Sequence, residues 1–539
     1  VSTGDTLLLQ VSARSLAERN CNASTFGTTD YSTGFYFVSQ HAETYQNYQQ
    51  LQVTLPSNGQ WVRVSMPYTS QLDAGPGEAN FNFDFGFNFS QTVELANVSV
   101  LNYGNTTSPH QLPTCCNSYD GRALNASWRA DAAARINRYR RGNVSVLVRN
   151  RTTGQPVPFA GLQVNMTRHE FRFGSMLSSY MLQEDPNATG PIFTNFRKLF
   201  NHAVAESGFD WGGFEQNGTT LYWTERLVEY ITKNLTLPMR GHVLVWPRCD
   251  AYGLPKEICA LIAQNKTEAA LLATHNHILS EMSFWQNTLI EEVNVINEIS
   301  YCHLMQNVSS PATQSVTLAQ WLNASATAAP HIGRRINDIA VFSSAFDDGN
   351  NDFFHELLLD VVNQGKTVDG QSVLTGFGAE SHFSAALPSV AKVLKALSWF
   401  EQHRDQFSLA ITEFDVLTTD EDLYGDWTRD FLTLAFASPA VDRFIMWGFD
   451  DGTHWLGSAP LFYADWTPKP GLKHWIDLIY NQWWTTETEK TNSSGMATVR
   501  AFYGQHQIIV TPLSGSQQPT VLSNVTINRN TTTLVVEVS

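Results

Sequence analysis

Two glutamates stand directly after apolar runs, where they could act together in acid–base chemistry. Glu298 follows the run 293–296 and Asn297, and Glu413 follows the run 409–412. A pair of facing carboxyl groups is what cleavage of a glycosidic bond requires, because one protonates the leaving oxygen while the other attacks the sugar carbon or activates water. A single glutamate in such a place is more often a helix cap or a salt-bridge partner. The prediction of hydrolytic chemistry therefore depends on the pair.

Short apolar strands that alternate with helices from residue 171 to about 480 would position this pair. The candidate strands are 171–177, 202–206, 239–245, 291–297, 339–343, 374–380, 408–413 and 443–449. Eight strands over about 310 residues favour a (β/α)8 TIM barrel, an α/β fold in which catalytic residues lie at the carboxyl ends of the strands. The glutamates end the fourth and seventh strands. Their separation of 115 residues fits three βα units of about 31 residues with one insertion.

Aromatic side chains gather at the same predicted strand ends. Trp246 follows the third strand, Trp447 ends the eighth, and Trp455 lies in the loop after it. Flat rings stack on the apolar faces of sugars, so we expect these three to contact a carbohydrate. His382 ends the sixth strand, next to the strand of Glu413, and could hydrogen-bond that carboxylate and keep it ionised.

The regions that flank the barrel alternate in hydrophobicity with a period of two residues. Residues 1–105 predict an N-terminal β-sandwich of the jelly-roll kind, in which the run 81–89 places every phenylalanine on one face. Residues 106–170 predict a linker, a helix and a β lead-in. The barrel would then occupy 171–482, and 483–539 would form a small C-terminal β module.

The composition excludes several classes of partner. The chain has 34 basic and 50 acidic residues among 539, a net charge of −16, and 12% of it is aromatic. Because no basic stripe could neutralise phosphates, we expect no nucleic-acid partner, and because no apolar run reaches about 18 residues, we expect no membrane span. Low charge with many aromatic residues favours a large buried core.

Acceptor sites for N-glycosylation, Asn-x-Ser/Thr, are more frequent than chance would readily provide. Seventeen occur, spread over all regions, and they predict a secreted, extracellular glycoprotein whose weakly charged surface is kept soluble by glycans. The alternative is an Asn/Thr-rich loop composition without glycans. The acceptor asparagines are Asn22, Asn88, Asn97, Asn105, Asn125, Asn143, Asn150, Asn165, Asn187, Asn217, Asn234, Asn265, Asn307, Asn323, Asn492, Asn524 and Asn530.

Six cysteines fit an oxidising compartment. Cys249 and Cys259 lie ten residues apart and are the best local pair, and Cys21 could join Cys115 or Cys116 across the first domain. No Cys-x-x-Cys or His-rich cluster indicates a metal site, and we expect no cofactor.

The motifs and their order resemble glycoside hydrolase family 10, the endo-β-1,4-xylanase family, over about 170–480. The matching segments are Arg240-Gly241-His242 with Trp246, Asn297-Glu298, Glu380-Ser381-His382, Thr412-Glu413-Phe414-Asp415, Trp447-Gly448-Phe449 with Trp455, and Pro468-Lys469-Pro470. Glu380 and the segment 128–174 are typical of plant and animal members. Residues 1–105 are similar to a carbohydrate-binding module.

The resemblance implies a retaining mechanism in which Glu413 is the nucleophile and Glu298 is first the acid and then the base, with the two carboxyl groups about 5–5.5 Å apart. The implied partner is a polysaccharide or oligosaccharide substrate. The resemblance assigns substrate binding to Asn297, His382, His242, Trp246, Glu206, Trp447 and Trp455.

Several sugar-binding positions depart from the family pattern. Where the family has Asn and Lys after the second strand, this chain has Ser207 and Asp210, so a donor to substrate hydroxyls becomes an acceptor. Pro247 stands where many microbial members have His.

Two hypotheses follow. The first is a secreted retaining endo-β-1,4-glycanase acting on xylan or a related plant-type β-glycan, with room for an altered glycone specificity. The second is a catalytically weak or inactive extracellular glycoprotein that binds carbohydrate or serves in an assembly, including a homo-oligomer.

Overall fold

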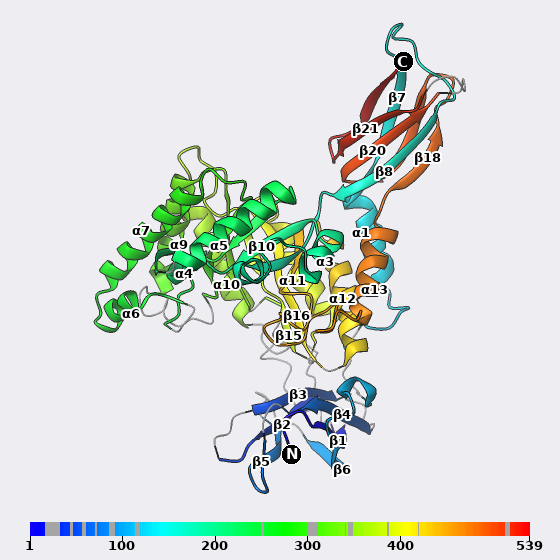
Figure 1. Cartoon of the computed structure of the whole chain (residues 1–539). Helices are drawn as coiled ribbons and strands as arrows, with labels where there is room; N and C mark the ends of the chain where they lie inside the picture. The colour runs from blue at the N-terminus through cyan, green and yellow to red at the C-terminus, as the bar shows by residue number, and fades with distance from the viewer. Residues whose placement is uncertain are drawn as a thin grey trace.

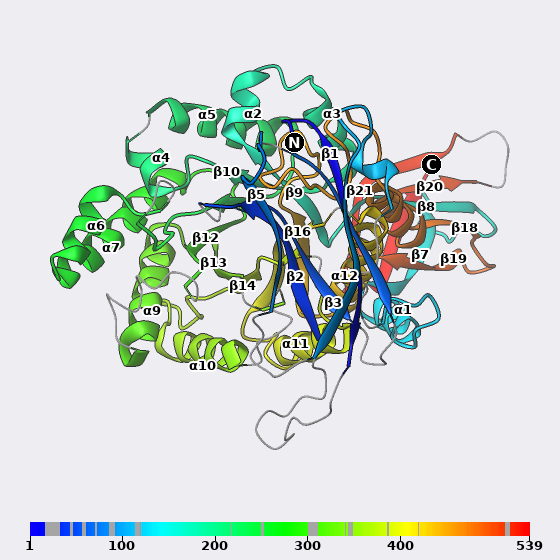
Figure 2. The ribbon, with the colours of Figure 1, turned by 90° about the horizontal axis from the view of Figure 1, so that it is seen from below.

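Two β-rich units flank a central barrel. The computed structural model describes the chain apart from residues 17–32, 44–46, 56–60, 71–72, 86–91, 114–118, 120, 217, 250–252, 300–310, 340, 343–348, 385–386, 419 and 513–517. Figure 1 shows the N-terminal strands below the barrel and the C-terminal strands above it. In Figure 2, which looks from below, the helices of the central unit form a ring around its strands.

Eight parallel strands close into the barrel. Neighbours pair in chain order, and the last strand pairs with the first, so the sheet closes on itself. The (β/α)8 prediction is confirmed. The strands are β9 (Arg172–Ser178), β10 (His202–Glu206), β11 (Met239–His242), β12 (Glu292–Asn297), β13 (Gly333–Asp338), β14 (Gly376–Ala379), β16 (Ser408–Leu417) and β17 (Val441–Met446).

Helices between the strands cover the outside of the barrel. Two of the longer ones begin at side-chain caps: Ser389 accepts a hydrogen bond from the Lys392 N–H, and Asp420 accepts one from the Leu423 N–H. The helices are α2 (Ser179–Glu184), α3 (Pro191–Leu199), α4 (Trp211–Gln216), α5 (Gly218–Glu229), η2 (Tyr230–Asn234), α6 (Lys256–Ala263), α7 (Thr267–Trp285), α9 (Pro311–Ala328), α10 (Gly349–Gln364), α11 (Val390–Gln402), α12 (Glu421–Ala437), α13 (Pro470–Ile476) and η3 (Asp477–Gln482). A short strand, β15 (His382–Ser384), pairs with the end of β16.

The fifth barrel strand lies earlier than the sequence predicts. The apolar run 339–343 suggested that strand, but β13 spans Gly333–Asp338 and carries two buried arginines. The Arg335 guanidinium donates to Glu292 Oε2 (2.6 Å) and Asp442 Oδ2 (2.5 Å), on two other strands. Because the Arg335 charge is paired with two carboxylates, it can be buried inside the barrel. A search for apolar runs therefore misses this strand.

The strands on either side of the barrel in sequence form one two-sheet unit. One sheet has the order β18-β8-β20-β21 and the other β19-β7-β22, with a shared core of valines and isoleucines. The sequence prediction divided these strands between a lead-in and a separate C-terminal module. Their pairing spans more than 300 residues, which no local pattern reveals. The strands are β7 (Arg141–Asn150), β8 (Gly161–His169), β18 (Thr486–Lys490), β19 (Met496–Phe502), β20 (Gly504–Thr511), β21 (Thr520–Ile527) and β22 (Thr533–Val538).

The N-terminal unit is a pair of three-stranded antiparallel sheets that enclose one core. The orders are β4-β1-β6 and β3-β2-β5. Phe83 stacks on Phe37 with ring centroids 4.8 Å apart, as the predicted inward phenylalanine face requires. Part of the run 81–89 lies outside the described residues. The strands are β1 (Thr6–Ser15), β2 (Thr33–His41), β3 (Asn47–Leu55), β4 (Val62–Thr69), β5 (Ala79–Asp84) and β6 (Val93–Asn102), followed by a short turn of 3-10 helix, η1 (Pro109–Gln111).

A buried acid joins the lead-in to the barrel. The helix α1 (Trp128–Tyr139) packs on α12, where Arg129 donates to both oxygens of Asp430 (2.6 and 2.7 Å). The Tyr119 hydroxyl donates to the same carboxylate (2.7 Å).

Among the described helices, none combines the length and the hydropathy that a membrane crossing needs.

Candidate active site

The carboxyl-terminal sides of five barrel strands bring polar side chains together. These are Glu206 from β10, Glu298 after β12, Asn337 from β13, Glu380 after β14 and Glu413 within β16. Parallel strands end at the same side of a barrel, so residues far apart in sequence meet there. The two predicted catalytic glutamates are among them.

Glu413 is almost fully buried and is surrounded by donors. Asn337 Nδ2 donates to its Oε1 (2.7 Å), and His382 Nε2 lies 3.3 Å from its Oε2. His242 Nδ1 is 3.7 Å from Oε1. Burial alone would raise the pKa of Glu413, but His242, His382 and the buried Arg240 outweigh it and hold the pKa below its ordinary value.

His382 is held by a second carboxylate on its far side. Its Nδ1 lies 2.9 Å from Asp415 Oδ2, and Asp415 also accepts a hydrogen bond from the Trp455 indole (2.8 Å). Burial works to lower the pKa of His382, yet Asp415 and Glu413 raise it well above its ordinary value. The pKa of Asp415 falls to about 2, because His382 and His454 overcome the effect of its burial. His382 therefore lies between two carboxylates, with Nε2 facing Glu413 and Nδ1 facing Asp415.

The pKa of Glu298 is shifted in the opposite direction from that of Glu413. Burial, and then the negative charge of Glu413, raise the pKa of Glu298 to about 7, against the opposing influence of Trp246 and Arg248. Asn297 Nδ2 lies at hydrogen-bonding distance from its Oε1 (3.4 Å). Near neutral pH Glu413 is thus ionised, while Glu298 is still partly protonated.

Three non-glycine residues with left-handed backbone follow the same strand ends. Ser207, Glu298 and Ser381 adopt left-handed backbone with φ of 70°, 49° and 68°. Such a conformation costs a non-glycine residue about 1–2 kcal/mol. It persists only where the surrounding structure enforces it, and it is most common at functional sites.

The residues that depart from the family pattern lie beside Glu206. Asp210 caps α4, since its Oδ1 accepts from the Gly213 N–H (2.7 Å) and its Oδ2 from the Gly208 N–H (3.0 Å). Burial, followed by the charges of Glu413 and Asp210, raises the pKa of Glu206 to about 7. Asp210, which stands at a sugar-binding position of the family pattern, is thus the cap of α4, and its negative charge contributes to the raised pKa of Glu206.

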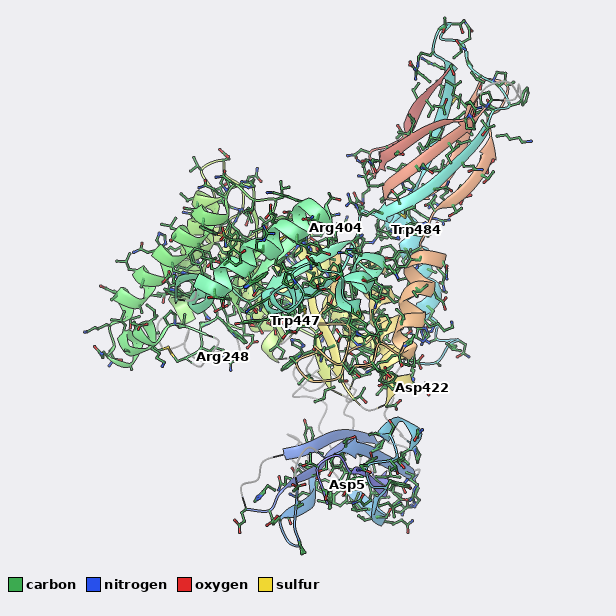
Figure 3. All side chains as sticks on the ribbon, in the orientation of Figure 1. Asp5, Arg248, Arg404, Asp422, Trp447 and Trp484 are labelled. Carbon is green, nitrogen blue, oxygen red and sulfur yellow. A yellow bond between two sulfur atoms is a disulfide. The ribbon has the colours of Figure 1, made fainter. Side chains whose placement is uncertain are left out.

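The three predicted sugar-contact tryptophans differ in exposure. Trp447 is 6% exposed and packs edge-on against His242, with centroids 4.8 Å apart. Trp246 is half-buried under the guanidinium of Arg248, 4.5 Å from the ring centroid. Trp455 is 58% exposed and is anchored by its bond to Asp415. In Figure 3, Trp447 lies within the barrel and Arg248 at its lower margin. Sugar stacking therefore stays a prediction best suited to Trp455.

Two residues at the centre of the site had no role in the sequence analysis. Asn337 was missed because the predicted fifth strand was placed after it. Its signal is the polar pair that follows Ile336 in β13. Asp415 belongs to a segment that matches the family, two residues after the predicted nucleophile. Its role is to hold His382 in position, and that role is visible only once the structure places His382 beside it.

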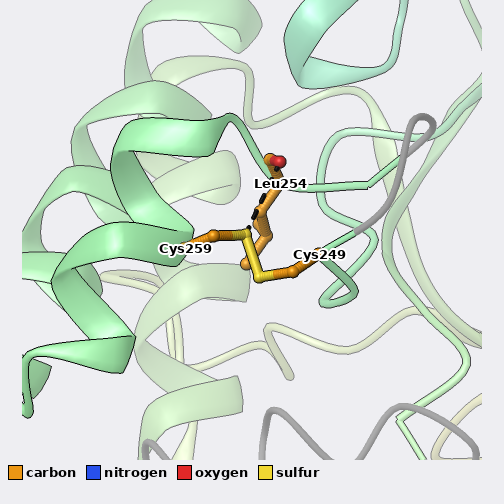
Figure 4. The surroundings of a disulfide bond; sticks show 3 residues. All are labelled: Cys249, Leu254 and Cys259. Carbon is orange, nitrogen blue, oxygen red and sulfur yellow. Dashed lines mark hydrogen bonds between the residues drawn. A yellow bond between two sulfur atoms is a disulfide. The ribbon is translucent and has the colours of Figure 1, made fainter.

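A disulfide closes the loop after β11. Cys249 and Cys259 are bonded, with Cα atoms 5.8 Å apart, and Figure 4 shows the bond beside Leu254. This confirms the local pair. It fixes the start of α6 next to the segment that carries Trp246 and Arg248. The other predicted pairing, Cys21 with Cys115 or Cys116, lies outside the described residues.

The acceptor asparagines lie at the surface wherever the structure describes them. Thirteen of the seventeen fall in the described part of the chain, and none of these thirteen is buried. Asn22, Asn88, Asn217 and Asn307 lie outside it. Side chains in these positions leave room for glycans.

Comparison with known proteins gives one family match and several structural neighbours. The model of glycosyl hydrolase family 10 matches residues 163–496. Anti-sigma-I factor RsgI6 from Acetivibrio thermocellus is 26% identical over 399 residues, covering 71% of this chain and 47% of that protein. The chain thus spans about half the length of this curated relative.

Several similar solved structures are xylanases. Xylanase 10B from Thermotoga maritima has 17% identity and a TM-score of 0.48, over 58% of this chain and 96% of that one. Xylanase 10B from Thermotoga petrophila RKU-1, solved with xylobiose, has 16% identity and a TM-score of 0.48, over 58% and 95%. Xylanase B from Clostridium stercorarium F9 has 18% identity and a TM-score of 0.46, over 57% and 97%.

Proposed function

The chain belongs to glycosyl hydrolase family 10, and from this we propose that it is a secreted, retaining endo-β-1,4-glycanase that hydrolyses xylan or a related β-glycan. The observation that carries the proposal is that the pKa values of the two carboxyls are shifted in opposite directions. The pKa of Glu413 is held low by its histidine neighbours, while the pKa of Glu298 is raised to about 7. A nucleophile must be ionised and a general acid must hold a proton.

In the first step Glu413 attacks the anomeric carbon while Glu298 gives its proton to the leaving oxygen. His382 and Asn337 hold the Glu413 carboxylate in position through both of its oxygens. Formation of the glycosyl ester removes the negative charge of Glu413. Because that charge is one cause of the raised pKa of Glu298, the pKa of Glu298 then falls, and Glu298 can act as base towards water in the second step.

The sugar ring would lie between these carboxyls and the side chains around them. His242 and Asn297 lie next to the pair, and Asn297 is fixed by the Asn294 amide, which donates to its Oδ1 (2.7 Å). Asn297 would contact the sugar 2-hydroxyl, whose hydrogen bonds strengthen in the transition state. Glu206 would line the glycone side, and the exposed ring of Trp455 offers a stacking surface.

Secretion is supported by the acceptor sites. Thirteen asparagines in sequons lie unburied in the described chain, and the Cys249–Cys259 disulfide is typical of oxidising compartments. Glycans would supply the surface polarity that a 16% charged content does not.

Assays on xylan, mixed-linkage glucan and carboxymethylcellulose test the activity, with Glu413→Gln as the matched inactive variant. We expect hydrolysis of at least one polymer by the wild type and a loss of several orders of magnitude in the variant. Proton NMR of the first sugar released should show the β-anomer, as retention requires. An initial α-anomer would contradict the mechanism.

The second candidate function is carbohydrate binding or extracellular assembly with little hydrolysis. The observation that favours it is the carboxylate Asp210 beside Glu206, where the family places a cation. Equal, background activity of the wild type and Glu413→Gln on every polymer would favour this function. Affinity gels containing each polymer, run with the full chain and with a chain lacking residues 1–105, test whether the N-terminal unit contributes to binding.

A further inference from the structure

The proposed nucleophile and two side chains beside it converge in a way that hydrolysis does not require. Glu380, His382 and Glu413 each offer one ligand atom, and these atoms all lie within 4.8 Å of one another. Glu380 is 0% exposed, and its Oε2 has no hydrogen-bond partner among the described residues. A buried, unpaired carboxylate oxygen is costly unless a cation or a proton satisfies it.

Each of the three ligands also has an outer partner that fixes its orientation. Asp415 Oδ2 lies 2.9 Å from His382 Nδ1, which leaves Nε2 facing the carboxylates. Asn337 Nδ2 donates to Glu413 Oε1 (2.7 Å) and lies 3.4 Å from Glu380 Oε1. A histidine backed by a carboxylate, and ligating carboxylates that accept hydrogen bonds, are the outer contacts typical of protein metal sites.

We propose that Glu380, His382 and Glu413 form a binding site for a divalent transition metal, best suited to Zn²⁺, which blocks hydrolysis by occupying the nucleophile. One imidazole and two carboxylates give three protein ligands and leave a fourth position for water, the usual arrangement of an open zinc site. Ca²⁺ and Mg²⁺ prefer six or more oxygen ligands and fit less well. A dication also relieves the repulsion between two adjacent buried carboxylates.

Zinc binding and hydrolysis are separable by variants. Glu380→Gln keeps the size of the side chain and removes one ligand charge, and we expect it to weaken zinc binding at least about 100-fold. Asp415→Asn removes the partner of His382 and should weaken binding by about 10- to 100-fold. Glu298→Gln is the matched control, an active-site carboxyl outside the cluster, and it should bind zinc as the wild type does.

The experiment is a titration of the metal-free full-length protein with ZnCl₂ in competition with a chromogenic chelator. We expect one zinc per wild-type chain, and X-ray absorption at the zinc edge should show one imidazole with oxygen ligands. These wild-type spectra keep the test valid even if a variant fails to fold. The absence of a stoichiometric zinc, unchanged binding by Glu380→Gln, or loss of binding by Glu298→Gln would overturn the site.

The inhibitory consequence rests on the proposed function, but the binding does not. If the enzyme hydrolyses a glycan, its rate should fall over the zinc range in which the binding curve saturates, and EDTA should restore it. Hydrolysis that persists at saturating zinc would overturn the inhibition. Zinc binding with no hydrolysis of any polymer would reject the proposed activity and leave the metal site standing.

Discussion

At the scale of single residues, the site depends on how differently two carboxyl groups are solvated and paired. Glu413 is buried among donors, whereas Glu298 is partly exposed and has the charge of Glu413 as its neighbour. The same residue type, a glutamate that follows an apolar run, therefore serves as nucleophile in one place and as acid in the other. The environment assigns the roles, not the residue type.

The pH dependence follows from the pKa of Glu298, which is raised to about 7. The acid must be protonated and the nucleophile ionised in the free enzyme, so kcat/KM should be highest between the pKa values of Glu413 and Glu298 and fall as the pH rises through about 7. Arg248 lowers the pKa of Glu298. Arg248→Ala should therefore move the alkaline limb upward, by about 0.5 pH unit, since a partly exposed charge pair contributes under about 1 kcal/mol.

Initial rates on a soluble substrate over the pH range measure this shift. Arg404→Ala is the matched control, because Arg404 is exposed and lies well away from Arg248 in Figure 3. A shift of the limb to lower pH in Arg248→Ala, or the same shift in both variants, would contradict the assignment of Glu298 as the acid.

At the scale of elements, Asp210 shows that one residue can both cap a helix and change a subsite. Asp210→Ala removes the cap of α4 and should lower the free energy of unfolding by about 1 kcal/mol, whereas Asp210→Asn should cost only a few tenths. Asp210→Lys loses the cap as well but supplies the cation of the family pattern. We expect it to raise kcat/KM on xylo-oligosaccharides and to lower Tm.

Thermal melts and steady-state kinetics on the three variants separate the two effects. Equal melting temperatures for the Ala and Asn variants would contradict the capping role. Unchanged kcat/KM in the folded Lys variant would show that position 210 does not reach the glycone subsite.

The strand β13 is stabilised by charge pairing, which predicts an unusual mutational response. Arg335→Met leaves Glu292 and Asp442 partly unpaired inside the barrel and should cost about 3–5 kcal/mol. Among the described residues, its neighbour Arg334 donates only to backbone carbonyls, those of Val373, Ile332 and Pro330. Arg334→Met should therefore cost less, about 1–3 kcal/mol. Urea denaturation followed by tryptophan fluorescence compares the two, and a larger loss in Arg334→Met would refute the argument.

The elements that could be predicted from sequence are those whose burial makes them apolar. Strands β12 and β16 are buried on both faces, so they contain apolar runs, and the glutamates that follow these runs were found for that reason. Strand β13 was displaced because its buried positions hold paired charges. Asn337 was lost with it. Such pairing depends on residues 43 and 107 positions away, which a local pattern cannot contain.

At the scale of the whole molecule, the barrel is inserted into a β-sandwich rather than followed by one. The valines of β7 and β8 pack against strands that come after the barrel, with Val146 paired to Ala497 and to Leu534. The sandwich is therefore completed only when the last residues of the chain are present. The sandwich strand β8 leads directly into the first barrel strand β9, and the chain returns from the barrel to β18 through α13 and η3 (Figure 1).

This arrangement predicts the outcome of shortening the chain. A chain that ends at residue 484 lacks β18–β22 and exposes the buried valines of β7 and β8, which would present unpaired strand edges to other molecules. We expect it to aggregate, whereas a chain that starts at residue 106 keeps both halves of the sandwich and should remain soluble. Size-exclusion chromatography and light scattering on the two shortened chains provide the measurement. A monodisperse chain ending at 484, with the melting temperature of the full protein, would show that the barrel folds independently of the sandwich and would refute the insertion argument.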